Sequence, residues 1–385
     1  MKRLLALIAV GAATAWVLWS HETLTTTVLF DREIVRILDK HCVMCHAENG
    51  PSFPLETYEQ TWLQKRTIHA ATIARHMPPW DAVPGYGQFI NENNLTLRET
   101  QFIVSWVEGL GPRNSGVVFT NTADPGAPRS QEVRAHADFN HWQLGQPQLT
   151  RQLAANTIES GQAATVKRTV IDFGFTSERR LRALEFMPSD RRVVRAAFFT
   201  IQETGQWIGS WTPWYGFVNL PKGSAYRLPA GSHIVAEIHY QGAKERVVEH
   251  GTLGLFFADP PSPDVVSDLL LEAKGPGQAG RLRASVRLAA DTYALALRPQ
   301  VLPDVAHPDM KSIEVSARRP DGGTDVLLFA KDLRLDWPTP YIFKEPVALP
   351  RGTELFVTAH YADSAQQNSG IRLTVSGYQK AIARR

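Results

Sequence analysis

Two cysteines and a histidine at fixed spacing are the residues of this sequence best suited to do chemistry. The stretch Cys42-Val43-Met44-Cys45-His46 holds both cysteines of the chain. Two thiols separated by two residues can add to the vinyl groups of one haem, and the next histidine can bind its iron. A redox-active thiol pair would not need that histidine, and a zinc site would need a second pair of ligands. We therefore predict one covalently attached haem c, bound through Cys42 and Cys45, with His46 as an iron ligand.

The ligand on the other face of the haem is expected from a loop. Met77 lies between His76 and two consecutive prolines, which would hold it rigidly. A methionine thioether stabilises reduced iron and raises the haem potential, as suits a protein that passes electrons onward. His76 and His69 are the alternatives, and either would lower the potential. The sequence favours Met77.

Residues 28–113 are predicted to form the all-α cytochrome c domain that positions these ligands. Apolar residues recur with helical spacing over residues 30–40 and 55–74, and prolines stop the second helix near Met77. Thr96 and Glu99 form a capping box at the start of a third helix. Residues 114–130 are rich in Asn, Gly, Pro, Thr and Ser, a composition typical of a linker.

Beyond the linker, the hydrophobic pattern changes to the two-residue period of β-strands, as in residues 233–240 and 281–288. A turn at 228–232 precedes a strand ending in His-Tyr, and the same arrangement recurs after a turn at 349–353. The repeat indicates two related β units. We predict two all-β, jelly-roll-like sandwich domains, over residues 131–260 and 264–380. The expected fold class is therefore multidomain, with an N-terminal all-α cytochrome c domain followed by two sandwiches.

The N-terminus and the overall charge indicate an exported protein that does not bind nucleic acid. Residues 1–20 begin with Met1-Lys2-Arg3 and continue with an uncharged apolar stretch, as in a signal peptide or a membrane anchor. With either, the rest of the chain is expected in the periplasm, and an uncleaved segment would anchor it to the inner membrane. The net charge is +3, and the basic residues are scattered rather than clustered.

Several parts of the chain together resemble a bacterial family that joins a small cytochrome c to a monooxygenase-like region. The matching parts are residues 42–46, 75–80, 89–91, 103–107, 109, 111–112, 211–213, 221–225, 228–240 and several stretches between 311 and 364. The second region of that family is similar to copper type II ascorbate-dependent monooxygenases, such as the peptidylglycine and dopamine β-monooxygenases. The resemblance implies two β domains, each with one copper bound mainly by histidines.

This chain departs from that family at most copper ligands. The paired histidines of the first domain fall on Arg195 and Ala196, whereas the third is kept as His239. His307 is the one candidate left from the ligand pair of the second domain, and no methionine follows Thr374. Because copper needs several converging imidazole or sulfur ligands, bound copper is not expected, and His239 and His307 are its remaining candidates.

The sequence thus favours an exported carrier of single electrons, with the β region docking redox partner proteins. Two alternatives stay open: a haem-fed copper-dependent monooxygenase, and a haem-bearing structural subunit of a membrane complex. No catalytic residue is predicted. The tryptophan-rich stretch 207–214 favours packing inside a sandwich over a binding patch.

Overall fold

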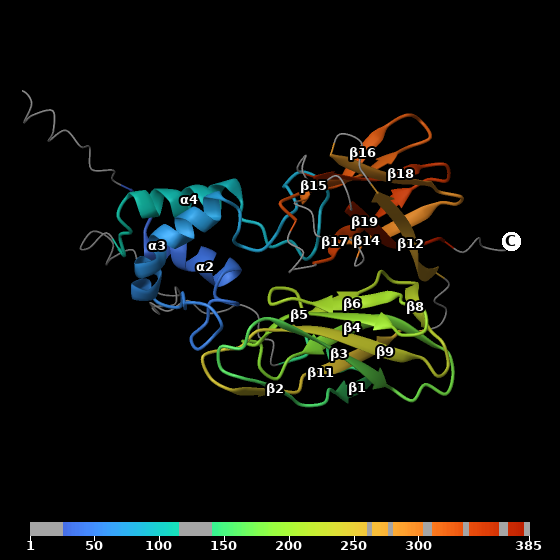
Figure 1. Cartoon of the computed structure of the whole chain (residues 1–385), viewed down its shortest axis with the longest axis horizontal. Helices are drawn as coiled ribbons and strands as arrows, with labels where there is room; N and C mark the ends of the chain where they lie inside the picture. Colours follow the sequence, from blue (N-terminus) through green and yellow to red (C-terminus); the bar gives the residue numbers. More distant parts are fainter. Residues whose placement is uncertain are drawn as a thin grey trace, which may run out of the picture.

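The computed structural model describes residues 26–114, 141–259, 264–275, 280–302, 310–333, 339–361 and 369–380. The predicted signal peptide or anchor over residues 1–20, and the predicted linker after residue 114, lie outside these ranges. No helix within them is long and apolar enough to cross a membrane. Figure 1 shows the helices gathered at one end of the molecule, beside two stacked groups of strands.

Residues 26–114, which we call the helical segment, contain one turn of π-helix and three short α-helices. These are η1 (Phe30–Ile34), α2 (Val35–His41), α3 (Tyr58–Ile73) and α4 (Leu97–Glu108). The predicted capping box is confirmed: the side chain of Thr96 accepts from the backbone of Glu99, and the side chain of Glu99 accepts from the backbone of Thr96. The helices enclose a small core centred on Phe30, Leu38 and Trp106.

The predicted fold class is wrong in its first part, because the described part of the chain contains no all-α cytochrome c domain. Among the residues that the structure describes, strands hold 46% and helices only 13%. Much of the helical segment is irregular, and its residues 80–91 belong to the β structure instead. Trp80 and Phe89 pack in the core of the second β unit, and Ala82 forms a β-bridge with Ala330. Helical periodicity located the three helices, but it gave no sign that the loops between them pack against strands.

The first β unit is a sandwich of two main sheets. One layer contains β1 (Leu149–Gln152), β11 (Thr252–Phe257), β4 (Arg179–Met187) and β8 (Ser224–Leu228), with β7 (Phe217–Asn219) also paired to β4. The other contains β3 (Thr165–Asp172), β9 (His233–Tyr240), β5 (Val194–Ile201) and β6 (Trp207–Trp211). A short ribbon of β2 (Asn156–Ile158) and β10 (Val247–Glu249) lies outside these sheets. Phe186 of one layer contacts Phe199 and Trp211 of the other. Trp207 and Trp211 are buried, which confirms the predicted packing role of the tryptophan-rich stretch.

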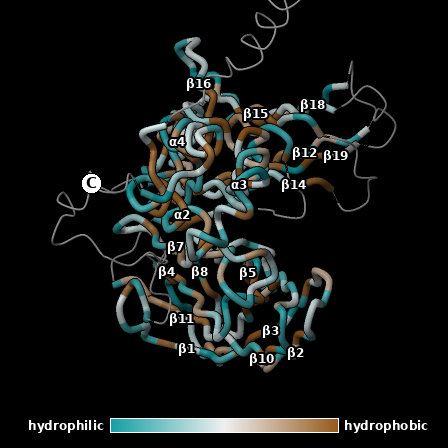
Figure 2. The backbone as a smooth tube through the Cα atoms, turned by 90° about the vertical axis from the view of Figure 1, so that its left-hand side faces the viewer, coloured by the Kyte–Doolittle hydropathy of each residue, from teal (hydrophilic) through white to brown (hydrophobic). Residues whose placement is uncertain are grey.

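The second β unit is also a sandwich. One layer contains β12 (Asp264–Gly275), β19 (Ser369–Tyr378), β14 (Thr292–Val301) and β17 (Tyr341–Leu349). The other contains β13 (Arg281–Arg287), β18 (Glu354–Tyr361), β15 (Met310–Arg318) and β16 (Thr324–Lys331). Figure 2 shows hydrophobic stretches along the strands of both units. The predicted β-sandwich architecture is therefore confirmed.

One sheet runs through both sandwiches. Strand β8 of the first unit pairs in parallel with β12 of the second, with Ser224 opposite Asp264 and Ala225 opposite Val265. The result is a continuous nine-stranded sheet. Residues of the second unit, including Val266 and Tyr378, accordingly complete the core of the first.

The predicted repeat agrees with the strand order. The separate layers run β3-β9-β5-β6 in the first sandwich and β13-β18-β15-β16 in the second, so β9 and β18 occupy equivalent places. Both layers also have a β-bulge at the equivalent point, between Val194 and Ala196 on β5 and between Met310 and Ser312 on β15. The bulge residue is basic in each case, Arg195 in the first and Lys311 in the second.

Candidate functional site

The Cys42–His46 motif forms a tight turn at the end of α2. The backbone N–H of Cys42 donates to the carbonyl of Leu38, and the carbonyl of Cys42 accepts from both Cys45 and His46. These bonds coil the motif so that both thiols and the imidazole line one cavity of 390 Å³. That volume lies within the range of about 300–1,000 Å³ that is usual for small-molecule and cofactor sites.

The ring of His46 is fixed by the loop that follows it. Its Nδ1 donates a 2.9 Å hydrogen bond to the carbonyl oxygen of Phe53, and the two rings lie 4.8 Å apart. The backbone N–H of Leu55 in turn donates to the carbonyl of His46. Because a carbonyl only accepts, the proton is on Nδ1 and Nε2 is the nitrogen able to bind a metal. Burial lowers the pKa of His46, which also favours the neutral, metal-binding form.

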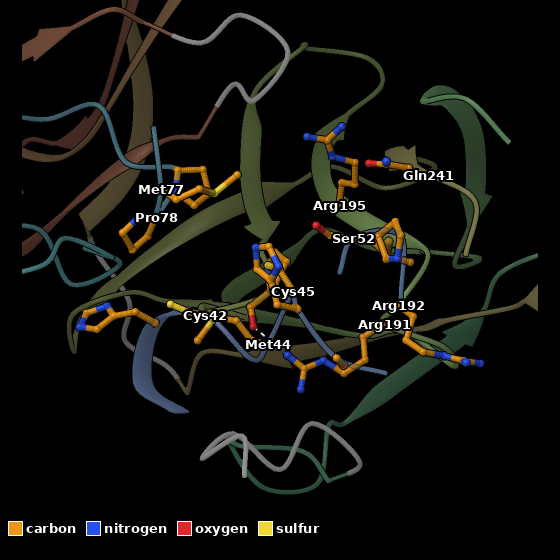
Figure 3. Close-up of a pocket in the computed structure, with 17 residues that line it drawn as sticks. Cys42, Met44, Cys45, Ser52, Met77, Pro78, Arg191, Arg192, Arg195 and Gln241 are labelled. Atoms are coloured by element: carbon orange, nitrogen blue, oxygen red, sulfur yellow. Dashed lines mark hydrogen bonds between the residues drawn. The ribbon is translucent and has the colours of Figure 1, made fainter. Parts of the chain in front are cut away.

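Met77 reaches the same cavity from the end of α3. The helix stops at Ile73, Arg75 adopts a left-handed conformation, and the N–H groups of His76 and Met77 both donate to the carbonyl of Ala71. This turn, together with Pro78 and Pro79, brings Met77 to the cavity wall, where its side chain is 40% exposed. Figure 3 shows Met77 on a different segment of chain from Cys42 and Cys45, at the same cavity.

His76 and His69, the alternatives to Met77 for the ligand on the other face of the haem, lie outside this cavity. His76 lines a separate hollow with Asp81, Lys331 and Asp332, and His69 sits on α3 with its Nε2 3.9 Å from a Glu108 carboxylate oxygen. His41 does line the cavity, but its Nδ1 and Nε2 lie 2.8 Å from Asn93 and 3.3 Å from Glu99. Of the candidates predicted from the sequence, the structure brings Met77 to the cysteines.

The first sandwich supplies the remaining wall of the cavity. Arg191, Arg192 and Arg195 line it from the start of β5 and the loop before it, and Pro213 and Gln241 line it as well. Figure 3 labels the three arginines and Gln241 at this cavity. Arg192 is paired with Asp190 at 3.0 Å and with Glu245 at 2.7 Å. Sequence reasoning missed these arginines as site residues, because their distance along the chain hides that they face the motif.

The two thiols are half-buried, and the pKa of each is raised above its ordinary value. Burial, with smaller effects from Cys45 and Glu99, raises the pKa of Cys42 to about 12. Burial also raises the pKa of Cys45 to about 11, although the charges of Arg191 and Arg195 oppose the rise. The cysteines are not joined to each other by a disulfide. Both cysteines therefore carry free thiols, and addition to a vinyl group requires this reduced state.

These residues fit a covalently bound haem. Two thiols one turn apart, an imidazole fixed in the metal-binding tautomer and a thioether from another segment are the donors that a c-type haem requires. The cavity brings all four together, and its cationic wall matches a cofactor that carries two carboxylates.

The residues expected as copper remnants do not form a comparable group. His239 lies on β9, opposite Ala196 of β5, with its Nε2 3.2 Å from the Glu237 carboxylate and its ring against Phe198. His307 lies outside the described residues. Within the ranges that the structure describes, no cluster of three or more His, Cys, Asp or Glu side chains could hold a metal ion.

Comparisons with known proteins give only remote likenesses. No family model matches the chain, and no curated protein matches it. The major capsid protein P2 of bacteriophage PM2 covers 61% of this chain and 99% of its own, with 8% identity and a TM-score of 0.26. PNGase F, a glycosylasparaginase from Flavobacterium meningosepticum, covers 60% and 96%, with 10% identity and a TM-score of 0.27. Likenesses this low carry no information about function.

Proposed function

We propose that this chain is an exported electron-transfer protein that carries one haem c on Cys42 and Cys45, with His46 and Met77 as iron ligands. The observation that supports it best is the convergence of these four side chains on one cavity, with Nδ1 of His46 bonded to Phe53. When bound, the haem would supply a one-electron couple at its iron.

Attachment would use the cysteines as nucleophiles toward the two vinyl groups. Each sulfur would form one S–C bond to a vinyl carbon, and the thiol hydrogen would pass to the neighbouring carbon. The C=C bond becomes a single bond, nothing leaves, and no oxidant is consumed. The step therefore needs both thiols reduced, as they are here.

The rest of the chain would serve delivery and exchange of the electron. Residues 1–20 would direct the protein to the periplasm, as a leader or as an inner-membrane anchor. Met77 is 40% exposed, so a redox partner protein could approach the cavity at this residue. The β region, which resembles the copper monooxygenases without most of their ligands, would dock that partner.

Expression in a host that assembles c-type cytochromes tests this proposal. Wild-type protein should keep its haem through denaturing gel electrophoresis, and Cys42→Ser with Cys45→Ser should lose it. Metal analysis of the native protein should give about one iron per chain. Colourless wild-type protein with both thiols free would refute the proposal, and two coppers per chain would favour the monooxygenase alternative.

A further inference from the structure

Three arginines of the first sandwich line the cavity, and they differ in their contacts and in their position on the chain. Arg192 is held by the carboxylates of Asp190 and Glu245, so its charge is balanced locally. Arg191 donates from Nη2 to the carbonyl of Pro213 at 2.9 Å, which orients its guanidinium. Arg195 stands at the bulge of β5.

The bulge explains how Arg195 reaches the cavity. Val194 pairs with Tyr240 and Ala196 pairs with His239, so Arg195 is the extra residue between two consecutive pairs. A bulge of this kind turns a side chain away from the regular alternation of a strand. Its neighbours Val194 and Ala196 are buried, whereas Arg195 is half-buried and lines the cavity.

Both charges act where the cofactor would be attached. Arg191 and Arg195 line the same cavity as Cys45, one of the two cysteines proposed to hold the haem. Burial lowers the pKa of Arg191 itself to about 10, so its guanidinium lies in a poorly solvated place that an anion would stabilise. Guanidinium groups are well suited to carboxylates, which they can bind through two parallel hydrogen bonds.

We propose that Arg191 and Arg195 bind the propionate carboxylates of the haem, so that the first sandwich forms part of the haem site. This inference rests on the function proposed above. The helical segment then supplies the thiols and the iron ligands, and the sandwich supplies the cationic partners. Two positive charges beside the haem also favour the reduced iron, which carries one positive charge fewer than the oxidised iron.

The test compares Arg191→Gln, Arg195→Gln and the double variant with Arg195→Lys and with Arg227→Gln. Arg227 is the matched control, because it lies on β8 of the same sandwich, pairs with Glu178 and does not line the cavity. Haem staining after denaturing electrophoresis reports attachment. Potentiometric titration and the resonance Raman bending bands of the propionates report the proposed contact.

Every variant should keep covalent haem. The double Gln variant should raise the oxidised-to-reduced ratio at a fixed potential roughly tenfold, equivalent to a midpoint potential 59 mV lower for a one-electron couple. The propionate bands should shift in the Gln variants, and Arg195→Lys should retain a potential near that of the wild type. Arg227→Gln should change neither readout.

Two failures are distinguishable. If the wild type carries no covalent haem, the proposed function fails and this inference fails with it. If haem is attached but the Gln variants match Arg227→Gln in potential and in the propionate bands, the arginine contact is refuted while the attachment stands. Should the double variant or Arg191→Gln fail to fold by circular dichroism, Arg195→Gln decides alone, because its side chain is half-buried and lies at a bulge.

Discussion

Phe53 accepts a 2.9 Å hydrogen bond from Nδ1 of His46 through its backbone carbonyl. A backbone acceptor cannot rotate away as a side chain can, so the imidazole is oriented by the path of the chain itself. The same loop returns to His46 through the N–H of Leu55. Nε2 is thereby the ring nitrogen that remains available to a metal.

Replacing Met77 with Ala should change the haem without releasing it. Loss of the thioether removes the ligand that stabilises reduced iron, so the midpoint potential should fall by on the order of 0.1 V, within the about 0.8 V that axial ligands span. The absorption band between methionine sulfur and ferric iron should disappear. Met44→Ala is the matched control, since Met44 lines the same cavity inside the motif. A Met77→Ala protein with the wild-type band would exclude Met77 as the ligand.

The carboxylate of Glu99 predicts an acid-sensitive helix start. Burial raises its pKa, but hydrogen bonds from Thr96 and Lys40 and the charge of His41 outweigh that effect and hold the pKa at about 2, against an ordinary 4.5. A depressed carboxylate pKa stabilises the folded protein above pH 4.5, and this stabilisation is lost as the pH falls toward 2. When urea unfolding is measured at about pH 6 and at about pH 2.5, the free energy of unfolding should fall less between the two for Glu99→Gln than for the wild type. Equal slopes would contradict the assignment.

Thr96→Ala should weaken the same helix start at neutral pH. It removes the hydroxyl that accepts from the N–H of Glu99 at 3.1 Å. The expected loss in the free energy of unfolding is about 1 kcal/mol. Thr96→Ser keeps an acceptor at the same place and should restore most of it. A Thr96→Ala protein as stable as the wild type would show that the cap contributes nothing.

Residues 80–91 of the helical segment pack against the second sandwich. Trp80 should therefore contribute to the stability of both the helical segment and that sandwich. Its side chain is 3% exposed and contacts the rings of Phe89 and Tyr341. Trp80→Ala should lower the free energy of unfolding by about 3–5 kcal/mol. Amide exchange at Val83, which donates to Phe329, should accelerate at the same time. Leu63→Ala is the control, because Leu63 is 74% exposed and should change stability by less than about 0.5 kcal/mol.

Alanine substitutions at two glycines within residues 80–91 distinguish the cost of backbone strain from the cost of steric crowding. Gly85 and Gly87 both have positive φ, 93° and 81°. A Cβ at Gly85 meets nothing within 4 Å, whereas one at Gly87 would lie 2.4 Å from the carbonyl oxygen of Leu327. Gly85→Ala should therefore cost about 1–2 kcal/mol, and Gly87→Ala a further 1–3 kcal/mol or so, in urea unfolding. Equal losses would mean that the loop moves freely off the sandwich.

The sequence predicted what local patterns determine. Helical spacing, the capping box of Thr96 and Glu99, the period-two strands and the repeated turns all appear in the structure. It could not predict the fold of residues 80–91, because the partners of Trp80 and Phe89 lie far along the chain in the second sandwich. The error in fold class follows from this: a pattern within one segment does not show which distant strands that segment packs against.

The candidate site divides in the same way. The motif at 42–46 and the proline-flanked Met77 are visible in the sequence because their meaning depends on near neighbours. Arg191 and Arg195 have no such signature. The resemblance placed Arg195 at a lost copper position, but only the structure shows that Arg195 lies at a bulge of β5 and lines the cavity of Cys45, which His239 does not line.

The parallel pairing of β8 with β12 determines how this chain can be divided for experiments. Cutting after the first sandwich would strip Ser224 and Ala225 of their hydrogen-bonded neighbours and remove Val266 and Tyr378 from the core that they complete. Each half would expose an open strand edge, the kind of surface through which proteins aggregate. The two sandwiches are therefore expected to fold and unfold together, and to be passed on in evolution as one unit.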